Sequence, residues 1–183
     1  MSNILITSVG RRVSLVKAFI KELKAIDDKA KVYVTDAFPK LSSAAQVAHK
    51  AFEICKISNN AYVDLLLEIC IQNRVSLIIP TIDTELMILS KNHKRFSAIN
   101  VEIALSTEKF IEICDNKLNT YHLFKEMNVS FPKIYSKQKY ELPIFIKPII
   151  GSSSHDNYIV KNKNQISNHH IESKKLQFFE YLD

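Results

Sequence analysis

The sequence predicts an α/β protein that begins with a Rossmann-like parallel sheet. Residues 3–8 form an apolar run that ends in small side chains, as expected for a first parallel strand buried on both faces. After the turn at residues 9–12, apolar residues recur with helical spacing as far as Ile26. A second apolar run, 31–36, ends in an acid, and this strand–turn–helix–strand order is typical of a Rossmann-like half.

The alternation of strand-length and helix-length patterns continues through residue 114. We expect further strands at 51–55, 76–79 and 100–105, and helices at 41–49, 60–73, 84–89 and 106–114. Asp115 begins a new helix, in which Asn128 is placed to end the helix in the left-handed conformation. We therefore divide the chain into a first domain, 1–114, and a second domain, 115–183.

The second domain contains shorter elements. We expect strands at 144–146, 157–160 and 176–183, a hairpin tip at 152–154, and a moderately amphipathic helix that runs to about residue 173.

Composition points to a soluble globular protein with a sizeable core. The chain has 183 residues, of which 46% are hydrophobic and 24% charged. Because no apolar run approaches the ~20 residues of a membrane helix, we expect no membrane association. No cleavable leader is expected, and the three scattered cysteines predict buried thiols in a reducing cytoplasm. The formal charge of +6 comes without a basic block, which disfavours nucleic acid as a partner.

The first candidate site is the loop that follows the strand at 144–146. Lys147 ends this strand, and Gly151, Ser152, Ser153 and Ser154 follow a proline. A lysine beside a loop of small and hydroxyl side chains suits a polyphosphate, because backbone N–H groups and hydroxyls can surround its oxygens. The alternative is a strand that ends in a surface lysine and a serine-rich turn.

Other polar residues follow the predicted parallel strands. Gly10, Arg11 and Arg12 begin the first helix, where the arginines would bind a carboxylate or phosphate or else lie on the surface. Asp36 either contacts substrate or caps the next turn. Because Gly10 is the only glycine in this region, the G-x-G-x-x-G pattern of dinucleotide sites is absent, which disfavours an NAD site.

A third group lies beyond the strand at 76–79. Thr81, Asp83 and Glu85 follow Pro80 at the sheet edge where open α/β sheets place ligands. Capping of the next helix by Thr84, with Glu85 in its first turn, is the structural alternative. Asp83 is the stronger candidate for a substrate contact. No histidine spacing predicts a metal site, and no catalytic triad is evident.

Four segments, taken in order, resemble the ATP-grasp superfamily. They are 3–12, 79–86, 115–120 and 143–154, and the second is similar to a loop in the branch of the carbamoyl-phosphate synthase large subunit. The resemblance implies that the second domain is the α+β amino-terminal part of a grasp domain. It also implies that Lys117, Lys147 and Ser152, Ser153 and Ser154 contact ATP phosphates. Glu180 and Leu182, in a Glu-aromatic-aliphatic segment, would meet the adenine.

The resemblance further implies ATP-dependent ligation of a small-molecule carboxylate to an amine through an acyl phosphate. Mg²⁺ would be held by residues of the family that lie beyond the adenine-binding segment, so we expect the 183 residues alone to be inactive. A homodimer, or a partner chain that completes the grasp, would then be required. Two alternatives are a non-catalytic nucleotide- or ligand-binding module and an interaction subunit that pairs through the strand at 176–182.

Overall fold

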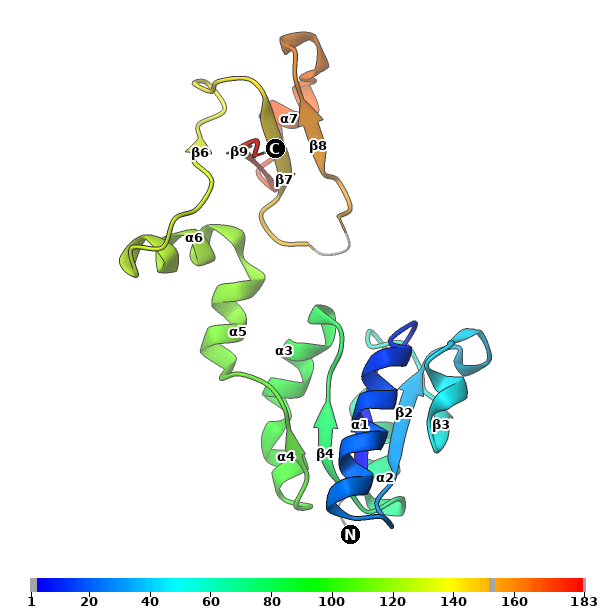
Figure 1. The fold of residues 1–183 in the computed structure, drawn as a ribbon. Helices are drawn as coiled ribbons and strands as arrows, with labels where there is room; N and C mark the ends of the chain where they lie inside the picture. The colour runs from blue at the N-terminus through cyan, green and yellow to red at the C-terminus, as the bar shows by residue number, and fades with distance from the viewer. Residues whose placement is uncertain (1–2, 152–153, 183) are drawn as a thin grey trace. The chain divides into compact units, whose positions relative to one another are not determined.

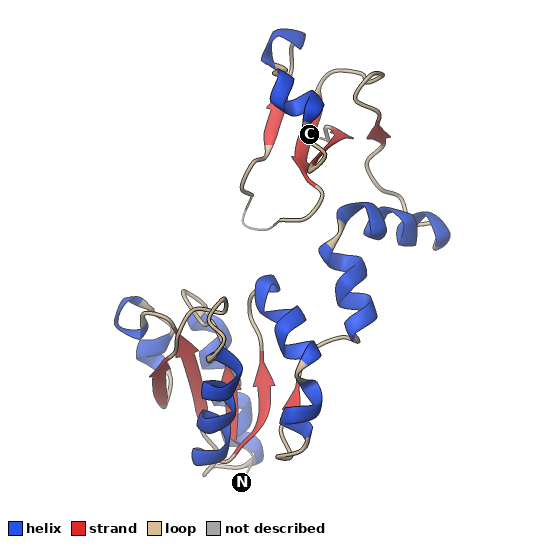
Figure 2. Cartoon of the chain, turned by 180° about the vertical axis from the view of Figure 1, so that it is seen from behind, coloured by secondary structure: helices blue, strands red, loops and turns tan. Residues whose placement is uncertain are grey.

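Two separate sheets organise the chain. In the computed structural model, which describes residues 3–151 and 154–182, one sheet is parallel and the other antiparallel. The parallel sheet belongs to a unit formed by Met1–Glu108, and the antiparallel sheet to a unit formed by Lys109–Asp183. Figure 1 labels most helices and strands of both units, and Figure 2 colours the strands red and the helices blue.

The five strands of the first unit follow the order β3-β2-β1-β4-β5. Their bounds are β1 (Asn3–Ile6), β2 (Val32–Asp36), β3 (Lys50–Glu53), β4 (Val75–Ile79) and β5 (Glu102–Ile103). All four strand pairs are parallel, which confirms the predicted Rossmann-like α/β sheet. The strand order reverses direction between β1 and β4, where doubly wound sheets bind their ligands.

Helices cover both faces of this sheet. They are α1 (Val13–Ile26), α2 (Tyr62–Gln72), α3 (Asp83–Lys91) and α4 (His93–Ser97). Successive residues of β1 enter different cores, because side chains alternate across a strand. Ile4 and Ile6 join a cluster with Val16 of α1, whereas Leu5 joins a cluster with Leu66 of α2. Burial on both faces explains why the strand has no polar alternation.

Two predictions for the first unit are wrong in detail. The helix expected at 41–49 is replaced by two 3-10 turns, η1 (Pro39–Leu41) and η2 (Ala45–Val47). The Ser42 hydroxyl between them donates to the Gly10 carbonyl at 2.6 Å, a tertiary bond that interrupts the local periodicity. The strand expected at 100–105 is shortened to β5, because Asn100 adopts a left-handed conformation with φ 57°.

The second unit begins with two helices and continues as an antiparallel sheet of order β6-β9-β7-β8. Its elements are α5 (Glu108–Asp115), α6 (Lys117–Glu126), β6 (Ile134–Tyr135), β7 (Ile144–Pro148), β8 (Tyr158–Val160), η3 (Lys163–Gln165), α7 (Asn168–Glu172) and β9 (Leu176–Glu180). Asn128 has a φ of 55°, so the predicted left-handed residue after α6 is confirmed.

One face of this sheet forms a core, and the other carries Lys147. Ile144 and Ile146 of β7 are fully buried with Phe178 of β9. Phe145 and Lys147 alternate with them and therefore point to the opposite face. There, Lys147 lies against the ring of Phe179.

Strand β9 pairs with β6 on one side and with β7 on the other. It is therefore an inner strand, and the prediction that it presents an unpaired edge to a partner is wrong. The thiol prediction also fails at Cys114, which is exposed, whereas Cys70 is buried. Within the described residues, no helix is both long enough and apolar enough to cross a membrane.

Candidate functional site

The turn after β1 is built around Gly10 and Asp36. Gly10 adopts a φ of 51°, a region that favours glycine because it has no Cβ. One carboxylate oxygen of Asp36 accepts a hydrogen bond from the Gly10 N–H at 2.9 Å. The other accepts from the Phe38 N–H, also at 2.9 Å. Asp36 therefore holds the β1 turn and its own turn together.

Arg12 and Thr81 connect β1 to the segment after β4. The Arg12 guanidinium donates to the Thr81 carbonyl at 2.7 Å and to the Ser8 carbonyl at 3.3 Å. The Thr81 hydroxyl lies 2.8 Å from the Thr7 carbonyl and 2.9 Å from the Ser8 carbonyl. These contacts bridge the point where the strand order reverses. Arg11, by contrast, is exposed.

Glu85 lies in the interior of the first unit. Its side chain is fully buried, and its carboxyl oxygens accept hydrogen bonds from the Thr7 hydroxyl, at 2.8 Å, and from the Tyr62 hydroxyl. Burial raises the pKa of Glu85, and the two hydroxyls lower it in part. Burial and the neighbouring Glu85 carboxyl together raise the pKa of Tyr62. Three elements, β1, α2 and α3, thus meet at one carboxyl group.

The helix that carries Glu85 begins one residue earlier than expected. Asp83 is its first residue, Ile82 occupies the N-cap position, and no side chain caps the helix, so the alternative of a Thr84 cap is wrong. Asp83 is exposed, and its carboxylate accepts from the Thr84 N–H at 2.9 Å. A crevice of about 270 Å³, lined in part by Ser8, Asp36 and Tyr62, lies at this edge of the sheet.

In the second unit, α6 brings Lys117 to the loop that follows β7. Asn116 is the N-cap of α6, and its side-chain oxygen accepts from the Leu118 N–H at 2.9 Å and the Asn119 N–H at 3.3 Å. The Lys117 N–H donates to the Ile149 carbonyl at 3.0 Å. The Lys117 ammonium donates to the Gly151 carbonyl at 3.1 Å. The backbone N–H and the side-chain ammonium of Lys117 therefore both contact the loop that follows β7.

Lys147 is the penultimate residue of β7, the strand that leads into the same loop. Its ammonium lies 4.4 Å from the centre of the Phe179 ring and 5.6 Å from that of Phe145. Burial lowers the pKa of Lys147, and the positive charge of Lys117 lowers it further. Within the described part of the chain, neither ammonium forms an ion pair with a carboxylate. The structure thus brings together two cations that sequence separates by thirty residues.

The remaining predicted nucleotide contacts do not all lie near this pair, since β9 pairs Glu180 with Ile144 at the opposite end of β7 from Lys147. Ser154 is exposed with a φ of 58°, whereas Ser152 and Ser153 lie outside the described residues. Glu180 is half-buried, and its carboxylate accepts from the Lys133 N–H at 3.0 Å. Leu182 is exposed, beyond the end of β9. No group of three metal-binding side chains occurs among the residues that the structure describes.

Two contributors were not anticipated from sequence. Tyr62 was expected only as an apolar position of its helix. A buried tyrosine hydroxyl usually needs a hydrogen-bond partner, and this requirement could have indicated a polar contact at Tyr62. Phe179 was expected only as part of an apolar strand. Its contact with Lys147 follows from the pairing of Phe145 with Phe179 in adjacent strands, which sequence spacing does not reveal.

Comparisons with known proteins agree with this architecture. The family described as "PylC-like, N-terminal domain" matches residues 4–104, more than half of the chain. A search of curated proteins finds no match. The family match and the similar solved structures described next support the predicted ATP-grasp superfamily. The finer resemblance to the carbamoyl-phosphate synthase branch stays a prediction.

Solved structures share the fold at low sequence identity. The biotin carboxylase of Campylobacter jejuni, solved as a β-γ-ATP complex, has a TM-score of 0.70 at 13% identity, over 100% of this chain and 45% of its own. The biotin carboxylase domain of Hydrogenobacter thermophilus 2-oxoglutarate carboxylase, solved as a dimer with MgADP, ADP and bicarbonate, scores 0.69 at 12%, over 98% and 44%. An L-amino acid ligase from Bacillus licheniformis scores 0.67 at 14%, over 100% and 45%. The chain thus spans less than half the length of these proteins.

Proposed function

Because the chain belongs to the PylC-like N-terminal domain family, we propose that it is an ATP-grasp protein whose second unit binds the polyphosphate of ATP. The observation that carries the proposal is the pair formed by Lys117 and Lys147. Burial and the positive charge of Lys117 lower the pKa of Lys147, and neither ammonium has a carboxylate partner among the described residues, an arrangement that favours a bound polyanion. Both adjoin a loop whose backbone is accessible at Gly151.

The open face of the antiparallel sheet suits the rest of the nucleotide. Phe145 and the partly exposed Ile159 lie on this face, because each alternates with a buried neighbour. We place the adenine against them, with backbone groups of Glu180 and Leu182 at its edge. Similar folds have been solved with a β-γ-ATP compound and with MgADP, which supports nucleotide binding as a function of this fold.

Bound Mg²⁺ would supply charge neutralisation for the phosphates. We propose no magnesium ligands among the residues described here. The contribution of Lys117 and Lys147 is to orient the polyphosphate and to stabilise its negative charge.

The parent activity we propose is ATP-dependent ligation of a carboxylate to an amine. We propose that it is of the kind found in the ATP-grasp branch that resembles the large subunit of carbamoyl-phosphate synthase. The carboxylate attacks the γ-phosphorus, ADP leaves, and the amine then displaces phosphate from the acyl phosphate. In the first unit, Gly10, Arg11, Arg12, Asp36, Thr81, Asp83 and Glu85 are the proposed substrate residues. Of these, Arg11 and Asp83 are exposed and could contact a small molecule directly, whereas Glu85 is buried and would act only by holding the surrounding segments in place.

Titration with a fluorescent ATP analogue in the presence of Mg²⁺ tests nucleotide binding. Replacing Lys117 by Ala or Lys147 by Met should weaken binding at least tenfold, because a charge-assisted hydrogen bond contributes about 1.5–3 kcal/mol. Lys161→Ala is the matched control, since Lys161 is an exposed lysine of the same unit at the end of β8. Equal affinity in all three variants would refute the proposed site.

The second candidate is a binding module without catalysis, which the contacts of Lys117 and Lys147 with the loop after β7 would support by themselves. ADP release, measured with panels of carboxylates and amines, separates the two functions. We expect binding without turnover, with turnover appearing only when a partner chain completes the grasp. Magnesium-dependent turnover by the chain alone would exclude the module.

A further inference from the structure

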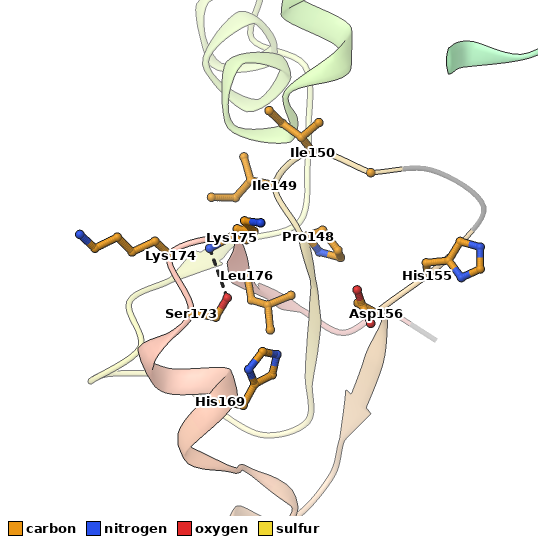
Figure 3. A pocket seen from close by; sticks show the side chains of 11 residues that line it. Pro148, Ile149, Ile150, His155, Asp156, His169, Ser173, Lys174, Lys175 and Leu176 are labelled. Atoms are coloured by element: carbon orange, nitrogen blue, oxygen red, sulfur yellow. Dashed lines mark hydrogen bonds between the residues drawn. The ribbon is translucent and has the colours of Figure 1, made fainter. Parts of the chain in front are cut away.

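The second unit contains a hollow on the core side of its antiparallel sheet. It forms where β7 ends at Pro148 and β9 begins at Leu176, and it has a volume of about 710 Å³ (Figure 3). Sites for small organic molecules usually measure about 300–1,000 Å³. Pro148 and Leu176 alternate with Lys147 and Gln177, so they face away from the side of the sheet that carries Lys147. This hollow is therefore distinct from the proposed nucleotide face.

Its lining combines an apolar floor with a basic rim. Pro148, Ile149 and Leu176 supply apolar surface, and Ile150 forms part of the wall although it is 60% exposed. Lys174 and Lys175 stand at the rim, and in Figure 3 Lys174 lies on the side opposite His155, with Lys175 between Lys174 and Pro148. Asp156 is the one carboxylate among the lining residues. An apolar floor with an excess of cations complements a small molecule that has an apolar body and an acidic group.

The wall of the hollow is also the loop that binds Lys117. The Ile149 N–H donates to the Lys175 carbonyl at 2.8 Å, and the Ile149 carbonyl accepts from the Lys117 N–H at 3.0 Å. Ile150 forms an antiparallel bridge with Asn116, the N-cap of α6. A ligand in the hollow would therefore contact a peptide segment that is hydrogen-bonded directly to Lys117.

We propose that this hollow binds a small organic anion, an apolar ring or chain that carries one carboxylate, sulfonate or phosphate group. The apolar body lies on Pro148 and Leu176, and the acidic group pairs with Lys174 and Lys175. Occupancy fixes the Ile149–Ile150 peptide and through it the position of Lys117. This last step rests on the proposed nucleotide function, whereas binding of the anion does not.

The probe is 8-anilino-1-naphthalenesulfonate, an aromatic monoanion, added without nucleotide to the full chain with ¹³C-labelled isoleucine methyl groups. We expect saturable shifts at Ile149 and Ile150, with small shifts at the exposed Ile26 and Ile71 of the first unit. N-phenyl-1-naphthylamine has the same rings without the sulfonate and should bind at least tenfold more weakly. The double variant Lys174→Glu/Lys175→Glu should weaken probe binding at least tenfold.

The matched control is Lys161→Glu/Lys163→Glu, which makes the same charge change at exposed positions of the same unit outside the hollow. Thermal melts establish that both double variants are folded. Equal weakening by the two pairs, equal affinity for the neutral probe, or shifts confined to other isoleucines would overturn the site. Titrating the ATP analogue with and without saturating probe then tests the link to Lys117. An unchanged nucleotide affinity would remove the link and leave the anion site standing.

Discussion

The two units treat their polar side chains in opposite ways. At the carboxyl edge of the parallel sheet, protein groups already bind Asp36, Arg12 and Glu85. In the second unit, Lys117 and Lys147 approach the same loop without a carboxylate partner in the described part of the chain. A polar group whose hydrogen bonds are complete stabilises the fold, whereas an uncompensated charge favours a ligand. We therefore propose that Asp36, Arg12 and Glu85 act mainly by holding the first edge in shape, and that the second unit binds a polyanion.

This difference predicts where substitutions will reduce stability and where they will reduce affinity. Changes at the inner residues of the first unit should cost free energy of unfolding. Changes at the lysines of the second unit should cost nucleotide affinity and little stability.

Replacing Glu85 by Ala should have the largest effect on stability. It leaves the buried hydroxyls of Thr7 and Tyr62 without their acceptor, and each unsatisfied group costs about 1–3 kcal/mol. We expect a loss of about 3 kcal/mol, measured as about hundredfold faster hydrogen exchange in peptides of β1 and β4. Asp83→Ala, an exposed change two residues away, should cost less than about 1 kcal/mol. Equal costs at the two positions would contradict an internal role for Glu85.

The raised pKa of Glu85 also predicts a pH dependence. In the folded state the carboxyl retains its proton to higher pH than in the unfolded state, since burial disfavours its charged form. Its contribution to stability is therefore complete below the ordinary glutamate pKa and is lost as pH rises through the folded pKa. Unfolding free energies from pH 4 to 8 should fall more steeply for the natural protein than for Glu85→Gln. Burial also raises the pKa of the Cys70 thiol, to about 12. Because pH 8 lies below the ordinary cysteine pKa as well, this thiol stays mostly protonated in both states and contributes little to the slope. Identical slopes would contradict the prediction.

Asp36→Ala should have an intermediate effect. It removes the acceptor for the N–H groups of Gly10 and Phe38, but this edge is half-exposed and water can replace part of the loss. We expect about 1–2 kcal/mol, measured by urea denaturation. Asp36→Asn keeps one oxygen acceptor and should cost less. If Asp36→Ala leaves stability unchanged and weakens a substrate instead, the first edge is a binding site like that of the second unit.

Strands β1, β2 and β4 of the first unit were predictable because the signal is local. The apolar runs of β1, β2 and β4 are buried on both faces, so every residue of each strand contributes to the pattern. The helix expected near residue 45 failed for the opposite reason, since the Ser42–Gly10 bond joins segments 32 residues apart.

The polar contacts show the same limit. Glu85 was expected at the end of its strand, but its hydroxyl partners lie 78 and 23 residues away in sequence. Only the folded chain shows that they meet. The approach of Lys117 to the Lys147 loop was expected from family resemblance alone, because helix and strand periodicity do not relate α6 to β7.

Asn116→Ala should cost about 1 kcal/mol, because it removes the side-chain acceptor for the Leu118 and Asn119 N–H groups. The loss should be local, appearing as faster hydrogen exchange at the start of α6 and as weaker nucleotide binding through Lys117. Asn116→Asp retains the cap and places an acid where the helix dipole favours it, so it should preserve the helix. Unchanged exchange in Asn116→Ala would show that contacts of Lys117 with Ile149 and Gly151 suffice to hold the helix end.

Lys147→Met should have the smallest effect on stability. The variant loses the contact of the ammonium with the Phe179 ring, which is worth about 0.5–1 kcal/mol at an exposed site. It also removes a partly desolvated charge and its repulsion with Lys117, which act in the opposite direction. We expect the free energy of unfolding from urea denaturation to change by less than about 0.5 kcal/mol, while ATP-analogue affinity falls at least tenfold. A loss of more than about 2 kcal/mol with affinity intact would make Lys147 a structural residue and remove the contrast between the units.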